Sequence, residues 1–338
     1  MNHKQHLAFV DWMKTMGMFA IVLGHFFPPT IQYLTYAFSV QLFFFVSGFL
    51  FRKCPNQRTF WHKNMQGLIV PYFILGGVNV FYTMMRTEDF NTILCSMIGL
   101  CLGISNVANH GGCGGLWFVM TLLVLKVIFQ YMNLSKVILL MLLMFPMIIF
   151  YREVIAGGPY EYFGFSFCNV FIAYPFFLVG YILSEYCYDK VIVLSSFLER
   201  KYRCLSFLGG VAFLSLLYVF SPMNGIVYMI YGGFGNQIQR FLLYSFIGII
   251  GVYLLAVVFS RHKCTKWGKT ISSGSILILA FQGYFIERIV PRLEILTGGK
   301  NALYEYGSVM ISIIIMLLFV PIIKWFQRYI PIVLGKRK

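Results

Sequence analysis

Long apolar runs separated by short polar segments occupy almost the whole chain of 338 residues. About 20 apolar residues are needed to cross the hydrocarbon core of a bilayer as a helix, and about ten runs approach this length. They lie at residues 8–27, 34–51, 66–86, 115–132, 136–151, 167–186, 205–220, 240–260, 273–291 and 305–326. The pattern predicts an all-α integral membrane protein: a bundle of about ten transmembrane helices in a single domain, residues 1–338.

One further apolar segment, FNTILCSMIGLCLGIS at residues 90–105, is short and contains glycine. We expect it to be a re-entrant or interfacial piece rather than a span. No internal repeat is evident along the chain.

Basic residues are distributed unevenly between the two sets of loops. If the N-terminus is cytoplasmic, 19 of the 27 Lys and Arg residues lie in inside segments, six lie outside, and Lys14 and Lys126 lie within spans. The inside residues are Lys4, Arg52, Lys53, Arg58, Lys63, Lys136, Lys190, Arg200, Lys201, Arg203, Arg261, Lys263, Lys266, Lys269, Lys324, Arg328, Lys336, Arg337 and Lys338. The outside residues are Arg86, Arg152, Arg240, Arg288, Arg292 and Lys300. This positive-inside asymmetry predicts an even number of spans with both termini in the cytoplasm, and an eleventh span at 90–105 would destroy it.

The composition agrees with a membrane protein. Hydrophobic residues make up 59% of the chain and charged residues 11%, about half the usual charged fraction of soluble domains. The net charge of +16 follows the loops and forms no separate basic module, so we expect no nucleic-acid partner. The first run carries Asp11 and Lys14, lacks a small-residue cleavage site and meets Pro28 and Pro29, which predicts a retained first helix rather than a cleaved signal peptide.

The eight cysteines are scattered, and neither a CxxC pair nor a His/Cys cluster occurs. We therefore expect free thiols and neither a metal site nor a bound cofactor.

The first run, AFVDWMKTMGMFAIVLGHFF, contains three residues that are costly inside a bilayer: Asp11, Lys14 and His25. At 100° per residue they fall within about 60° of one another, and the eleven residues from Lys14 to His25 rise roughly 16 Å. His25 is a candidate general base; the alternative is a helix-end histidine that contacts lipid headgroups. Asp11 lies too far away to orient His25, so we expect it to pair with Lys14, which could instead extend to the membrane interface.

Other polar positions give weaker indications. Ser47 and Gly48 at the end of the second run are most simply explained by close helix packing. Arg52, Lys53, Arg58 and Lys63 follow, and such a basic cluster either reflects topology alone or binds a polyanion such as coenzyme A.

Trp117 opens the fourth run as an interfacial anchor or as the lining of an outer pocket. Gln282 and Glu287 in the ninth run are expected to face the bundle interior.

The chain resembles the acyltransferase 3 family of membrane-bound O-acyltransferases. Lys14 and His25 have ten residues between them, as in that family's Arg/Lys-x10-His signature, and Asp11 stands where the family commonly has an acid. Further similar segments, in the family's order, are QLFFFVSGFLF (for FFxxSGF), FWHKNMQGLIVPYF, LWFVMTLLVLKVI, YPFFLVGYIL and WGKTISSGSILILAFQGYF. Two positions depart from the pattern: Gln66 replaces a second basic residue three after Lys63, and Gln282 replaces a histidine, which leaves His25 as the imidazole base.

The resemblance implies an enzyme of the bacterial inner membrane that uses acyl-CoA, commonly acetyl-CoA, as cytoplasmic donor. It also implies a carbohydrate acceptor on a surface polysaccharide or its lipid-linked precursor. In this interpretation His25, Asp11 and Lys14 are catalytic, and Lys14, Ser47, Arg52, Arg58 and Lys63 contact the donor. Trp117, Gln282 and Glu287 contact the acceptor.

Several alternatives stay open. His25 acts as a general base or forms a transient acyl-imidazole, and the acyl group is acetyl, succinyl or another small acyl group. A transporter or flippase for a lipid-linked sugar would also use intramembrane charges, although it often shows paired halves with broken helices. A structural membrane subunit would leave the polar stripe on the first run unexplained. A homo-oligomer is compatible with the sequence.

Overall fold

A computed structural model of the chain describes residues 7–105, 107, 112–140, 142, 167–260 and 265–335. These residues are helical or form turns and loops, and no strand occurs among them. The predicted all-α class is confirmed.

Six helical segments in the described part of the chain are long and apolar enough to cross a membrane: Ile31–Leu50, Gln57–Arg86, Gly114–Tyr131, Arg203–Asn224, Ile238–Ser260 and Ala302–Tyr329. Two helix pairs pass the same test together although each is sharply bent, which raises the number to eight if each pair is one span. The protein is therefore a multi-pass membrane protein. The number of ten spans and the cytoplasmic termini remain predictions, and the run at 136–151 lies mostly outside the described residues.

The described residues divide into two compact units. The first consists of Met1–Val46, Ile182–Tyr228 and Phe234–Trp325, and the second of Ser47–Tyr181, Met229–Gly233 and Phe326–Lys338. Helices α2 (Ile31–Leu50), α8 (Phe167–Tyr186) and α14 (Ala302–Tyr329) contribute residues to both.

In the first unit, α1 (Ala8–Gly24) packs against α11 (Ile238–Ser260), α12 (Thr265–Ser273) and α13 (Ser275–Thr297). Its 17 residues make it shorter than the six segments named above. At the C-terminal end of α1, Gly24 lies close to α2, and a Cβ added to Gly24 would be 2.9 Å from Thr35 Oγ1. α1 and α2 therefore form a tight helical hairpin.

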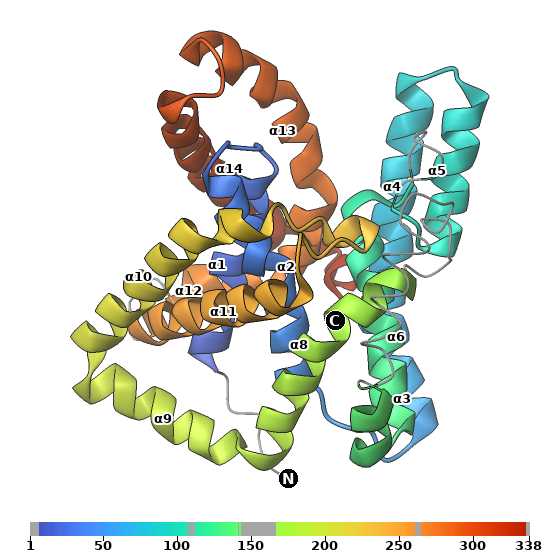
Figure 1. Cartoon of the computed structure of the whole chain (residues 1–338). Coiled ribbons are helices and arrows are strands. Elements are labelled where there is room, and N and C mark those ends of the chain that lie inside the picture. The colour runs from blue at the N-terminus through green and yellow to red at the C-terminus, as the bar shows by residue number, and fades with distance from the viewer. Residues whose placement is uncertain are drawn as a thin grey trace. The chain divides into compact units, whose positions relative to one another are not determined.

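Two helix pairs contain the bends. The axis turns by 91° between α8 and α9 (Tyr188–Lys201), and by 77° between α12 and α13 (Figure 1). The second bend occurs at Gly274, where a Cβ would overlap the side chain of Ile323 on α14. α10 (Arg203–Phe220) pairs with α11.

In the second unit, α3 (Gln57–Asn64) continues through a π-helical turn, Met65–Ile69, into α4 (Val70–Arg86). α4 packs against α5 (Phe90–Leu102; Figure 1). The Tyr72 hydroxyl donates a hydrogen bond to the Leu100 carbonyl (2.7 Å). With 13 residues, α5 is too short to cross a bilayer, as predicted for residues 90–105. α6 (Trp117–Tyr131) belongs to the same unit.

Candidate active site

His25 follows α1 directly. The first run was predicted to stay helical to residue 27, but the helix ends at Gly24 because Pro28 and Pro29 force the chain into a loop. His25 keeps right-handed helical dihedral angles (φ −72°, ψ −9°), so it stays on the same face as Lys14.

One hydrogen bond defines the chemistry of the His25 ring. Its Nδ1 lies 2.7 Å from the carbonyl oxygen of Ile21, one turn earlier. A carbonyl oxygen can only accept, so Nδ1 carries the proton and Nε2 carries a lone pair in the neutral ring. Nε2 makes no hydrogen bond with the described residues, and His25 as a whole residue is partly exposed. This tautomer can accept a proton from a substrate hydroxyl at Nε2.

At the other end of α1, Asp11 is held by α12. Its Oδ1 accepts a hydrogen bond from the Ser272 hydroxyl (2.7 Å), and one turn later the Thr15 hydroxyl donates to the Gly268 carbonyl (2.9 Å). Asp11 also acts electrostatically on Lys14, and the pairing of the two side chains stays a prediction. Asp11 and the His25 ring have different partners, so the prediction that Asp11 does not orient His25 is confirmed.

The loop after His25 is held by the first turn of α14. The buried Tyr304 hydroxyl donates to the Phe26 carbonyl (2.6 Å), and Glu305 Oε1 accepts from the backbone N–H of Thr30 (2.6 Å). The Thr30 hydroxyl also donates to this carboxylate. We did not predict these partners, because nothing in the local sequence links residues 26–30 to residues nearly 280 positions later.

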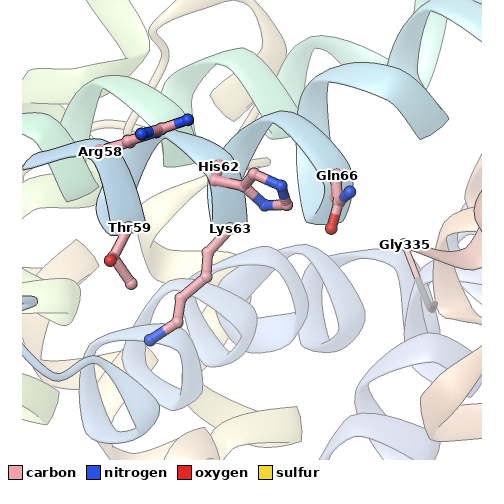
Figure 2. A pocket seen from close by; sticks show the side chains of 6 residues that line it. All are labelled: Arg58, Thr59, His62, Lys63, Gln66 and Gly335. Atoms are coloured by element: carbon pink, nitrogen blue, oxygen red, sulfur yellow. The ribbon is translucent and has the colours of Figure 1, made fainter.

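In the second unit, Arg58 and Lys63 line a cavity of about 470 Å³ with Thr59, His62, Gln66 and Gly335. Four of these side chains project from α3 in Figure 2, with Gln66 on the following turn; the four are Arg58, Thr59, His62 and Lys63. Asn56 caps the N-terminus of α3, and its side chain accepts a hydrogen bond from the Arg58 backbone N–H (2.8 Å). Three basic side chains on one open cavity form a surface that can bind phosphate groups. His62 was not among the predicted residues, although its position one turn after Arg58 could have indicated it.

Arg52 and Ser47 do not line this cavity. Arg52 donates to the Phe51 carbonyl (2.9 Å) and, at 3.4 Å, to the Phe49 carbonyl at the end of α2. Ser47 is half-buried, and a Cβ on the neighbouring Gly48 would overlap the Phe177 carbonyl of α8. The packing explanation of the Ser-Gly pair is therefore confirmed for Gly48.

The remaining candidates differ in burial. Trp117 is buried at the start of α6 in the second unit. Gln282 is buried in the first unit, as predicted, and its Oε1 has no hydrogen-bond partner within the described residues. Glu287 is exposed, so the prediction that it faces the interior is wrong. Five residues correspond to about 500° of rotation, which places Glu287 about 140° from Gln282 around the helix.

One comparison with known proteins identifies a family for this chain. Residues 7–330 match the sequence profile of an acyltransferase domain, Acyl_transf_3, which covers nearly the whole chain. No curated protein and no solved structure matches the chain.

Proposed function

The chain belongs to the acyltransferase 3 family, and on that premise we propose that it is a membrane O-acyltransferase that acylates a sugar hydroxyl. The donor is acyl-CoA from the cytoplasm, with acetyl as the first choice of acyl group. The acceptor is a surface polysaccharide or its lipid-linked precursor, and the enzyme resides in the bacterial plasma membrane.

The hydrogen bond from His25 Nδ1 to the Ile21 carbonyl carries this proposal. Nε2 takes the proton of the sugar hydroxyl while the hydroxyl oxygen forms a bond to the thioester carbonyl carbon. The tetrahedral intermediate collapses as its C–S bond breaks, and the imidazolium returns the proton to the sulfur of coenzyme A. The Ile21 carbonyl fixes the tautomer and stabilises the N–H of the imidazolium, a role that triad enzymes give to a carboxylate.

The donor is anionic, and the basic side chains provide its binding sites in the proposal. Lys14 lies on the His25 face of α1, and Arg58, His62 and Lys63 surround the cavity of the second unit. Charge-assisted hydrogen bonds to phosphates are the strongest that these side chains can form. Arg52 is a weaker candidate because it donates to the Phe51 carbonyl, and Ser47 is weaker because it does not line the cavity.

The acceptor is expected to use polar groups of the bundle. Among the described residues the buried Oε1 of Gln282 has no hydrogen-bond partner, and it suits a hydroxyl donor, since a buried acceptor left unsatisfied is costly. Trp117 and Glu287 remain proposed acceptor contacts, Glu287 now from an exposed position.

The decisive experiment supplies radiolabelled acetyl-CoA to membranes that contain the wild-type protein, His25→Ala or His25→Gln. Wild type should transfer label to glycan, and both variants should lose 10²-fold or more, the usual contribution of a general base. Equal labelling by wild type and variants would remove His25 from the mechanism. Label on the protein in the absence of acceptor, lost in His25→Ala, would replace the general base by an acyl-imidazole intermediate.

One observation favours the flippase alternative: the described part of the chain has two bent helix pairs, and transporters often contain broken helices of this kind. The segments at the two bends, SEYCYDK and SSGSILI, share no pattern and so give no sign of a repeat. A flippase moves its lipid-linked sugar without using acyl-CoA, so consumption of acyl-CoA by the purified protein separates the two functions.

A further inference from the structure

Phe27 has an unusual backbone conformation. With φ at +51°, it is the one non-glycine residue in the described part of the chain with a positive φ. A bulky side chain in this left-handed region is unfavourable, and such strain occurs preferentially at functional sites. Phe27 is also 42% exposed, so burial of its ring does not repay the strain.

The surrounding contacts hold Phe27 in this conformation. Its N–H donates to the Gly24 carbonyl (2.9 Å), and the preceding carbonyl, that of Phe26, accepts from Tyr304. Three residues later, Thr30 is bound by Glu305. The loop is thus fixed on both sides of Phe27, two residues after His25, and presents the aromatic ring outward.

The neighbours of the ring indicate a polar environment. Lys300 Nζ lies 5.8 Å from the centre of the Phe27 ring and 3.2 Å from Glu294 Oε1. The two side chains of this ion pair are 38% and 37% exposed. Charged groups are costly among acyl chains, so this end of the unit faces water or headgroups rather than the hydrocarbon core.

We propose that Phe27 is the platform on which the acceptor sugar packs, a role that rests on the proposed function. A pyranose ring has an apolar face of polarised C–H groups, which are attracted to the negative face of an aromatic ring. Hydroxyl groups at the edge of the sugar would meet the ammonium of Lys300, which is a hydrogen-bond donor. A rigid platform two residues after His25 would hold one hydroxyl near Nε2 and so select the acylated position.

The test removes the ring at a site where its removal relieves strain. Glycine and asparagine both accept a left-handed backbone, so Phe27→Gly and Phe27→Asn should fold at least as well as wild type. Purified proteins are assayed with acetyl-CoA and a concentration series of de-O-acylated surface polysaccharide from the source cells. We expect KM for the polysaccharide to rise about tenfold in both variants, equivalent to about 1.4 kcal/mol, with KM for acetyl-CoA unchanged and Phe27→Tyr close to wild type.

Phe220 provides a matched control, because it is an exposed phenylalanine of the same unit with an ordinary φ of −96°. Phe220→Ala should leave both KM values unchanged. An unchanged acceptor KM in Phe27→Gly and Phe27→Asn would overturn the platform, and so would equal effects on both substrates. A wild-type protein that consumes acetyl-CoA but does not label the polysaccharide would instead refute the proposed acceptor class.

Discussion

Lys14 lies on the face of α1 that also carries His25, and Asp11 acts on it electrostatically. If Lys14 binds the anionic donor, both the positive charge and the length of its side chain contribute to the binding. We predict that Lys14→Gln raises KM for acyl-CoA at least tenfold, about 1.4 kcal/mol, with a smaller effect on acceptor KM. Lys14→Arg should keep most of the affinity. Steady-state kinetics with each substrate varied in turn measures both values, and a larger effect on the acceptor would contradict the assignment.

Tyr304 makes a buried hydrogen bond to the loop that follows His25. Tyr304→Phe leaves the Phe26 carbonyl without its donor, so we expect a loss of about 1–3 kcal/mol. Thermal unfolding in detergent should show a lower midpoint. Tyr306→Phe is the control, because Tyr306 lies on the same turn of α14 and is 72% exposed. Equal midpoints for the two variants would show that the hydrogen bond contributes nothing to stability.

At the scale of elements, helix contacts depend on a few glycines. A Cβ at Gly48 would overlap the Phe177 carbonyl, whereas Gly77 on α4 has nothing within 4 Å of an added Cβ. We predict that Gly48→Ala destabilises the protein by about 1–3 kcal/mol through overpacking. Gly77→Ala should stabilise it by up to about 1 kcal/mol, because alanine favours a helix. Expression level and unfolding midpoint of the two variants test this contrast, and equal values would contradict the packing at Gly48.

The helices could be predicted from the sequence more completely than the contacts between residues. The apolar runs predicted the existence of most helices because burial in lipid requires long apolar segments. The stripe that joins Asp11, Lys14 and His25 followed from helical periodicity alone. The start of α1 at Ala8 agrees with the prediction, but its end at Gly24 and the exposure of Glu287 do not. Proline in the following loop and the rotation per residue act locally against the overall apolar pattern. Ser272, Tyr304 and Glu305 could not be predicted, since their partners are distant in sequence.

For the whole molecule, the uneven distribution of basic residues between the loops predicts which side of the membrane each loop faces, and the fold does not test this prediction. Gln57 and Arg200 should face the cytoplasm and Glu88 the outside, and all three are exposed. In a background without native cysteines, Glu88→Cys should react with a membrane-impermeant maleimide on intact cells. Gln57→Cys and Arg200→Cys should react only after permeabilisation. Labelling of Arg200→Cys on intact cells would require an odd number of spans between residues 57 and 200.

The bond between His25 and the Ile21 carbonyl also determines regiochemistry. With one ring nitrogen occupied by its proton and a backbone acceptor, an electrophile can add only at the other. Iodoacetamide should therefore give the Nε2-alkylated isomer of histidine almost exclusively, whereas a freely rotating imidazole gives a mixture. Chromatographic separation of the two isomers after hydrolysis would detect the tautomer directly, without any knowledge of the natural substrates.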